Sequence, residues 1–438
     1  MTRESAVLSI PGVAPPAPAG AGSGTRQRLV LSHALAALGM SMPWPVLLDL
    51  AWEQSGSGFM LGLVGAARML PYVLCSWWVA SLADRFGRRR VLGLTLWSRI
   101  LLLGAAAWVI GAGGAVGGAG GQTAGLAWAI VLATLAVACG TPAYPALVAS
   151  MPAAGPGNGR RATALLVTVE VSSFVVGPAL GGLVLGRWSP AMVLLAGACL
   201  TAGGLALIGR VRLPHVDSGP TAAAAAGAES ESAEISTDLP SKVVPLLRRS
   251  VRVRGAIAAI CVMNLVDASL LVALVPIADG RWGIPTAYGQ ATAAFGFGAL
   301  AAPALFWLGR TPTRQVHLGM ALFAVALCVL VPLSALVLVL LLLGVSGAAS
   351  VHVEAAATEL LQSDVPDRVR AHVLGVTDAL MVGAAMIGSF VGPVLVEAVG
   401  GSASLAVLAI VTVVAGTLVL PVVRHSATLR GSSAVEAD

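Results

Sequence analysis

The chain has 438 residues, of which 57% are hydrophobic and only 11% are charged, and its formal net charge is +6. A soluble domain carries charge on about a quarter of its residues, so this composition and the mean hydropathy of +0.89 exclude a soluble globular fold. The apolar runs are continuous rather than alternating, which argues against a β-barrel and for membrane-spanning helices.

Residues 1–28 are rich in Pro, Ala and Gly and lack the charged-then-apolar pattern of a signal peptide, so we expect a disordered cytoplasmic tail. Apolar runs long enough to cross a bilayer follow. We predict twelve spans near 29–50, 59–81, 91–111, 124–148, 162–186, 190–209, 256–278, 288–308, 315–332, 334–357, 371–397 and 403–422. The polar, low-complexity stretch between the sixth and seventh spans predicts a linker.

The expected fold is therefore an all-α membrane protein with two six-helix bundles, 29–209 and 256–422, joined by a cytoplasmic linker, 210–255, and followed by a cytoplasmic tail, 423–438. Of the 26 Lys and Arg residues, 22 fall on the side of the termini and the linker; two lie opposite and two lie within spans. Since Lys and Arg concentrate in cytoplasmic loops, we expect both termini in the cytoplasm and the protein in the cell (inner) membrane. This bias explains the net charge without a nucleic-acid partner.

The first span is interrupted by the sequence MPWP, Met42 to Pro45. Prolines bend a membrane helix and free backbone groups, which is tolerated where the helix lines a cavity. Trp44 and the nearby methionines would then offer a soft, apolar surface to a hydrophobic substrate. The alternative is a plain kink that faces lipid.

A short charged turn, SLADRFGRRR, separates the second and third spans. Gly87 permits the tight reversal of the chain, and the arginines follow the positive-inside rule. That rule does not account for Asp84, because an acid gains nothing from it.

This turn resembles the signature of the major facilitator superfamily, G-x-L-A-D-R-x-G-R-R-x-x-L. Eight of the nine specified positions match between Ala80 and Leu92, and the exception is Ala80, where glycine is usual. The resemblance implies twelve transmembrane helices in two pseudo-symmetric six-helix bundles, the major facilitator fold, working by alternating access.

The resemblance also implies a role for the turn as a conformational latch between the two halves. Asp84 would dock at the start of the eleventh span, near Arg370, where the positive end of a helix attracts a carboxylate. The same motif contributes Arg85, Gly87, Arg88 and Arg89. On this interpretation the turn switches conformation and does not bind substrate.

The fifth span contains GPALGG, in which Gly177, Pro178, Gly181 and Gly182 resemble the family's exporter-associated motif. The alternative is a kinked helix whose small residues permit close packing. The motif favours export, and its context resembles macrolide and siderophore efflux permeases. The Arg-x-x-Gln-Gly motif that many drug–proton antiporters carry in the fourth span is absent.

Ionisable side chains within spans are costly and usually functional. Asp267 lies in the middle of the seventh span, with Asn264 one turn away on the same face, and it is the leading candidate for coupling or substrate binding. Asp49 and Glu354 are further candidates. A structural carboxylate bonded to a neighbour is the alternative for each.

Four other intramembrane charges fit structural roles better: Arg68, Arg99, Glu170 and Asp378. For Glu170 and Asp378 the reason is that the fifth and eleventh helices of the family that the chain resembles mainly brace the two halves. The arginines could pair with Asp49 or with another nearby acid. No metal-ligand cluster or nucleotide-binding motif appears in the sequence, so we expect no cofactor, no metal and no enzymatic activity.

The sequence thus predicts a monomeric secondary transporter that exports a hydrophobic small molecule, such as a drug, antibiotic or secondary metabolite, with proton antiport as one route. Its expected partners are that molecule, protons and the lipid bilayer. The alternatives are an importer or uniporter of a small metabolite, or a membrane receptor or scaffold that does not transport.

Overall fold

The computed structural model describes residues 21–116, 118–150, 187–209, 211, 250–284, 286–309 and 311–433, together with parts of the stretch 166–185. Helices dominate these residues, and no strand occurs among them. The first half contains α1 (Ala21–Ser41), α2 (Pro43–Ser55), α3 (Gly58–Phe86), α4 (Arg88–Val116), α5 (Gly118–Gly140), α6 (Ala143–Ser150) and α8 (Pro190–Gly209). The second half contains α11 (Val251–Trp282), α12 (Ala287–Leu300), η3 (Ala302–Leu308), α13 (Pro312–Leu330), α14 (Leu336–Asp364), α15 (Asp367–Val399) and α16 (Gly401–Ser433).

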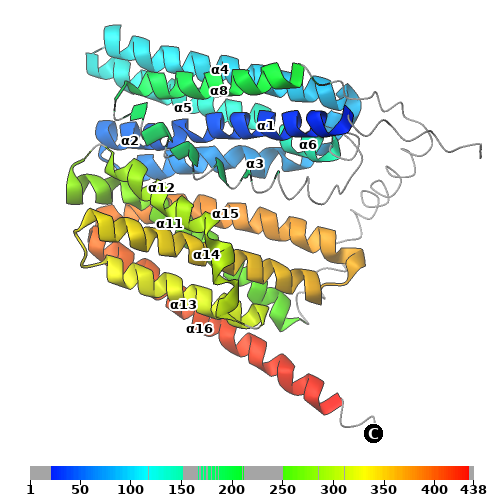
Figure 1. Ribbon diagram of the computed structural model, residues 1–438. Coiled ribbons are helices and arrows are strands. Elements are labelled where there is room, and N and C mark those ends of the chain that lie inside the picture. Colours follow the sequence, from blue (N-terminus) through cyan, green and yellow to red (C-terminus); the bar gives the residue numbers. More distant parts are fainter. Residues whose placement is uncertain are drawn as a thin grey trace, which may run out of the picture.

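The helices form two bundles that lie side by side, as Figure 1 shows. Helices α1 to α8 form the first bundle, and helices α11 to α16 form the second. The start of α1, the end of α8, the start of α11 and the end of α16 lie at the same end of the molecule. We call this end the terminal face and the opposite end the distal face.

Nine helices in the described part of the chain are long and apolar enough to cross a membrane, and a shorter apolar helix spans Gly58–Leu74. Helix α12 and the 3₁₀ helix η3 occupy the predicted eighth span. The predicted fifth span lies largely outside the described residues. The all-helical fold is confirmed, whereas the count of twelve spans stays a prediction.

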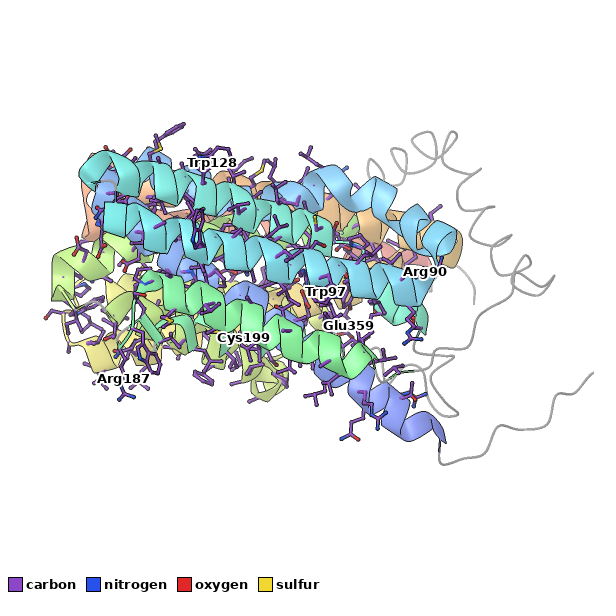
Figure 2. All side chains as sticks on the ribbon, turned by 90° about the horizontal axis from the view of Figure 1, so that it is seen from above. Arg90, Trp97, Trp128, Arg187, Cys199 and Glu359 are labelled. Atoms are coloured by element: carbon purple, nitrogen blue, oxygen red, sulfur yellow. The ribbon has the colours of Figure 1, made fainter. Side chains whose placement is uncertain are left out.

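The outer surface of the bundles carries many large apolar side chains, which Figure 2 shows around the helices. Trp128 exposes 61% of its surface and Trp108 exposes 73%. A soluble monomer rarely exposes so much contiguous apolar area. The exposed surface therefore suits contact with lipid.

The first span bends where the prolines predict it. Helix α1 ends at Ser41 and α2 begins at Pro43, because proline lacks a backbone N–H and its ring clashes with the preceding turn. The N–H of Met42 still donates to the Leu38 carbonyl at 3.1 Å, so the interruption is a bend with few lost bonds. Helix α1 also begins at Ala21, within the stretch predicted to be a disordered tail, and this makes that part of the prediction wrong.

Glycines of the predicted exporter-like motif pack directly against this bend. A Cβ atom at Gly177 would overlap the side chain of Ser41, and one at Gly181 would lie 2.5 Å from the carbonyl oxygen of Met42. Small residues let two membrane helices approach closely. Pro178 is buried beside them.

The second bundle repeats this arrangement. A Cβ atom at Gly388 of α15 would overlap the Leu265 carbonyl of α11, and one at Gly392 would overlap the Ser269 carbonyl. The Ser269 hydroxyl also donates to the Gly388 carbonyl at 3.0 Å. The bundles thus use the same glycine packing between equivalent helices, as internal repeats in transporters do.

The two bundles contact each other near the distal face through α3 and α15. A Cβ atom at Gly62 would lie 2.6 Å from the Phe390 ring, and one at Gly58 would lie 2.6 Å from the Pro393 carbonyl oxygen. The backbone N–H of Gly58 donates to Glu397 at 2.8 Å. Because Gly62 has no side chain, the Phe390 ring packs directly on the backbone of α3, and the two bundles are in close contact at this end.

Toward the terminal face the same two helix faces separate. Tyr72 continues the stripe of Gly58, Gly62 and Gly65 on α3, and it exposes 40% of its surface. On α15, Gly383 lies two turns from Phe390 on the same face, and a Cβ atom there would meet nothing within 4 Å. The space between the bundles is therefore closed at the distal face and open toward the terminal face.

Candidate functional site

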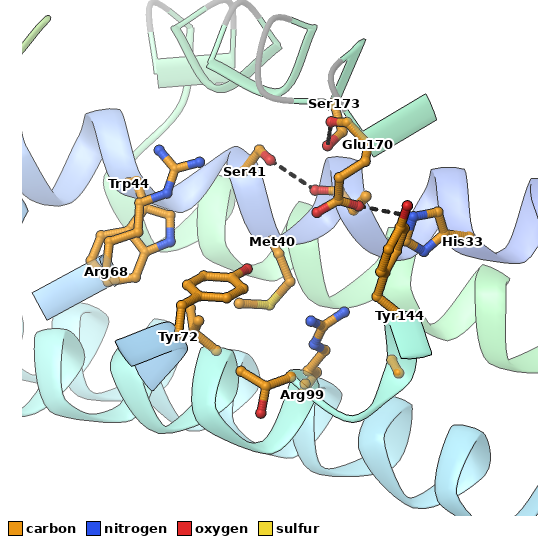
Figure 3. Close-up of a pocket in the computed structure, with 15 residues that line it drawn as sticks. His33, Met40, Ser41, Trp44, Arg68, Tyr72, Arg99, Tyr144, Glu170 and Ser173 are labelled. Carbon is orange, nitrogen blue, oxygen red and sulfur yellow. Dashed lines mark hydrogen bonds and ion pairs between the residues drawn. The ribbon is translucent and has the colours of Figure 1, made fainter. Parts of the chain in front are cut away.

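A polar pocket lies inside the first bundle, and Figure 3 shows its lining. Six of its polar or charged side chains come from five separated parts of the chain: His33, Arg68, Tyr72, Arg99, Tyr144 and Glu170. The open space between the lining side chains is about 60 Å³. A pocket with several charged groups at this depth is a functional-site candidate.

Glu170 is the only carboxylate among the residues that line this pocket. One of its oxygens lies 2.8 Å from His33 Nε2, and the Ser41 hydroxyl, also in the lining, donates to the Ala37 carbonyl at 2.9 Å. Arg68 and Arg99 both lie within electrostatic range of Glu170. The pocket therefore holds two guanidinium groups and one carboxylate that is already bound to a histidine.

Arg99 on α4 is the most buried cation of the pocket, with 9% of its surface exposed. Its Nε atom is fully buried and has no hydrogen-bond partner in the described part of the chain. Gly140 at the end of α5 makes room for it, since a Cβ atom there would overlap the guanidinium group.

One wall of the pocket is apolar. Met40 and Trp44, on either side of the bend in the first span, contribute to it together with Ala37 and Val137. Trp44 exposes only 2% of its surface, so the structure places it in the lining of the cavity and not toward lipid.

The second bundle contains a separate group of carboxyl groups. Asp267 of α11 accepts a hydrogen bond from the Ser350 hydroxyl of α14 through Oδ2. Its Oδ1 is buried without a hydrogen-bond partner among the described residues, and no ion pair to it occurs among them. Asp267 thus has an uncharged partner on one oxygen and none on the other.

Two more acids approach Asp267 from neighbouring helices. Glu354 of α14 lies within electrostatic range of Asp267, and Asp378 of α15 lies within range of Glu354. Asn264, one turn from Asp267 on the same helix, donates its amide to the Ile260 carbonyl at 3.0 Å and reaches toward Glu354. The side chain folds back on its own helix because a short amide can bond the carbonyl one turn earlier.

Asp49, another sequence candidate, does not line the pocket. It lies toward the distal end of α2, within electrostatic range of Glu53 and Asp279. Nearby, Trp52 Nε1 donates to Asp279 at 3.1 Å and links the two bundles. This acidic group therefore belongs to the closed distal face.

The predicted latch is described only in part. The turn places Gly87 at φ = +80° between α3 and α4, a conformation that favours glycine. Arg89 reaches the Gly209 carbonyl at 3.4 Å, and the Arg370 guanidinium donates to the Val365 carbonyl at 3.1 Å. The side chains of Asp84, Arg85 and Arg88 lie outside the described residues, so the docking of Asp84 stays a prediction.

The exporter-like motif also takes part in the contact between bundles. A Cβ atom at Gly182 would lie 3.0 Å from the Cα atom of Gly289 in α12. The motif residues thus pack closely on two sides, which is the physical role that their small size allows.

The sequence indicated the charges of the first-bundle pocket but not their assembly. Arg68, Arg99 and Glu170 were assigned structural roles, whereas the structure brings them together around one cavity. His33 and Tyr72 were not singled out, and neither was Ser350 in the second bundle. The available signal was a histidine and arginines within apolar spans, which are rare because they are costly there.

Within the described residues, no group of His, Cys, Asp or Glu has the arrangement of a metal site. The polar pocket and the acids of the second bundle therefore consist of charged and hydrogen-bonding side chains alone.

Comparisons with known proteins agree with this architecture. The sequence model of the Major Facilitator Superfamily matches residues 29–381. A search of curated proteins by sequence finds no match.

Among solved structures, the nucleoside transporter NupG is similar with a TM-score of 0.66 and 14% identity, covering 91% of this chain and 100% of that one. The inward-open xylose transporter XylE from E. coli is similar with a TM-score of 0.66 and 14% identity, covering 91% of this chain and 95% of that one. The peptide transporter POT is similar with a TM-score of 0.64 and 13% identity, covering 91% of this chain and 94% of that one. At these identities the similarity establishes a shared fold.

Proposed function

The chain belongs to the major facilitator superfamily, and from this premise we propose that it is a secondary transporter that exports a hydrophobic or amphipathic small molecule by proton antiport. Family membership points to a transporter rather than an enzyme. Drugs, antibiotics and secondary metabolites are the proposed substrate class. The proton is proposed to bind in the second bundle.

The observation that carries this proposal is the environment of Asp267. A carboxyl group at mid-span in a helix bundle needs a functional reason, because an ionisable group is costly in the membrane. One carboxylate oxygen of Asp267 accepts a hydrogen bond from the Ser350 hydroxyl. The other oxygen is buried without a hydrogen-bond partner among the described residues, and Asp267 forms no ion pair among them. A carboxyl group with such partners can hold a proton and release it without losing a salt bridge.

Export is supported by the residues of the first span that line the pocket and by the glycine motif of the fifth span. Met40 and Trp44 give the pocket an apolar wall, which suits an apolar substrate part. Gly177, Pro178, Gly181 and Gly182 resemble the motif associated with exporters and pack on the bend of that span.

Alternating access is supported by the asymmetry of the space between the bundles. Glycines close α3 against α15 at the distal face, whereas Gly383 and Tyr72 face open space nearer the terminal face. With the positively charged terminal face in the cytoplasm, this state faces inward. Asp84 and the arginines of its turn are proposed to latch the opposite state.

The proposal is tested with everted membrane vesicles that contain the protein and with matched vesicles that lack it. An acid interior should drive uptake of a hydrophobic compound from a fluorescent panel, and a protonophore should abolish that uptake. Uptake into right-side-out vesicles driven by external acid would instead favour the importer. Binding of a compound without flux in either orientation would favour the receptor.

The orientation is expected to place both termini and the linker in the cytoplasm, because Lys and Arg concentrate on that side. In a cysteine-free parent, Gly120→Cys should react with an impermeant thiol reagent added to intact cells, whereas Ala225→Cys should react only after the cells are broken. The cysteine-free parent controls for background labelling. Labelling of Ala225→Cys but not of Gly120→Cys in intact cells would show that the protein has the opposite orientation.

A further inference from the structure

The pocket of the first bundle has an unbalanced positive charge. Arg68 and Arg99 both line it, and Glu170 is the single carboxylate in its lining. That carboxylate is already occupied by His33, whose Nε2 atom lies 2.8 Å from it. The pocket thus carries more cationic than anionic groups in a place where uncompensated charge is expensive.

Arg99 is the residue of the pocket whose hydrogen-bonding capacity is least satisfied within the described residues. A guanidinium group has five N–H donors and no acceptor, and a buried charged group without partners costs several kcal/mol in general terms. Arg99 is about nine-tenths buried, its Nε is buried without a partner in the described residues, and it forms no ion pair among them. An anion that reaches it would supply the missing acceptor.

The sequence keeps this position open for the guanidinium group. Gly140 lies where a side chain would overlap Arg99, so α5 ends with the one residue that leaves the space free. Figure 3 shows Arg99 at the pocket with Tyr72 and Tyr144 on either side. The geometry is that of a built recess around a positive charge.

The recess can be reached from the opening between the bundles. Tyr72 lines the pocket and is 40% exposed on the face of α3 that separates from α15. Arg68 lies within electrostatic range of Tyr288 of the second bundle, which places it near the boundary between the two halves. The remaining space of about 60 Å³ holds several water molecules, and thus one small anionic group.

The second bundle offers no comparable place for an anion. Glu354 lies within electrostatic range of Asp267 on one side and of Asp378 on the other. No ion pair to any of these three acids occurs in the described part of the chain. An anion would be repelled there and attracted to the first bundle. The charges of the two halves therefore orient a bound molecule.

We propose that Arg99, assisted by Arg68, binds a carboxylate or phosphate group of the transported molecule, whose apolar part contacts Met40 and Trp44. The substrate class is then an amphipathic anion. This inference rests on the proposed transport function and narrows its substrate class.

The test measures equilibrium binding, which depends on neither a gradient nor a transport direction. The purified protein in phosphatidylcholine nanodiscs is titrated calorimetrically with 1-naphthoate, 1-naphthylmethanol and 1-naphthylmethylamine, which share a ring and differ in charge. We expect naphthoate to bind at least about tenfold more tightly than the other two, since a charge-assisted hydrogen bond adds that much. Equal binding of the alcohol or the amine would overturn the proposal.

Three variants assign the binding to the recess. Arg99→Gln removes the charge, and Gly140→Ala keeps the charge but displaces the guanidinium group; each should weaken naphthoate binding about tenfold or more. Arg187→Gln is the control, because Arg187 lies exposed at the distal end of the same bundle, and this variant should bind as the parent does. Parent-like binding by Gly140→Ala would overturn the proposal even if Arg99→Gln did not fold.

A lipid headgroup is the other source of the same anionic chemistry. Repeating the titration in phosphatidylglycerol nanodiscs should leave naphthoate binding by the recess unchanged. Loss of that binding would identify the headgroup as the occupant and overturn the proposal. Anion binding without proton-driven flux would sink the proposed function alone, whereas flux of uncharged compounds without anion binding would sink this inference alone.

Discussion

Asp267→Asn is expected to abolish proton-driven accumulation of substrate while exchange of substrate down its own gradient survives. Asparagine has the shape of a protonated aspartate and retains an oxygen that can accept the Ser350 hydroxyl bond seen in the structure. It has no proton to release, so the coupling step is lost while the two bundles can still alternate. Flux in vesicles with and without a pH gradient measures both activities.

The control for this variant is Glu359→Gln, which removes an exposed acid of the same bundle and should leave coupling unchanged. If Asp267→Asn still accumulates substrate with the pH dependence of the parent, Asp267 is not the proton carrier. If the variant protein fails to insert or fold, the carboxyl group has the structural role that the sequence left open.

Gly62→Leu is expected to hold the distal face apart and to stop transport. A Cβ atom at this position would already lie 2.6 Å from the Phe390 ring, and overpacking of this kind costs about 1–3 kcal/mol. That cost falls only on the state in which α3 and α15 touch, so the balance between states should shift about tenfold or more away from it. Substrate flux should fall accordingly.

Spin labels at Arg187→Cys and Ala335→Cys, which lie exposed near the distal ends of the two bundles, report the separation by pulsed electron resonance. We expect a longer distance in the Gly62→Leu background than in the parent. Gly104→Leu is the matched control, because a Cβ atom there meets nothing within 4 Å. An unchanged distance together with normal flux in Gly62→Leu would show that this contact does not close the distal face.

The two polar groups lie in different bundles, which bears on how they would be coupled. The arginine recess is in the first bundle and the acids are in the second. In an antiporter the proton and the substrate are bound in turn, so groups in separate bundles are expected to be coupled through the movement of the two bundles and not through direct contact.

The sequence alone determined the class of the fold, because the signals for it are local. Apolar runs of about 20 residues predict membrane helices without reference to any other part of the chain. Likewise, the prolines after Met42 predict the bend in the first span, and Gly87 predicts a tight turn, since each acts on its own backbone. The family signature depends on neighbouring residues in the same way.

Only the tertiary structure decided which side chains meet. The partner of Asp267 is Ser350, 83 residues away in the chain, and not Asn264 one turn away on the same helix. The partner of Glu170 is His33 of the first span. The arginines were visible in the sequence, but whether Arg99 faces a cavity depends on the absence of a side chain at Gly140. A helix turns about 100° per residue, so depth in the membrane can be read from sequence, whereas the helix that each side chain faces is set by packing between distant segments.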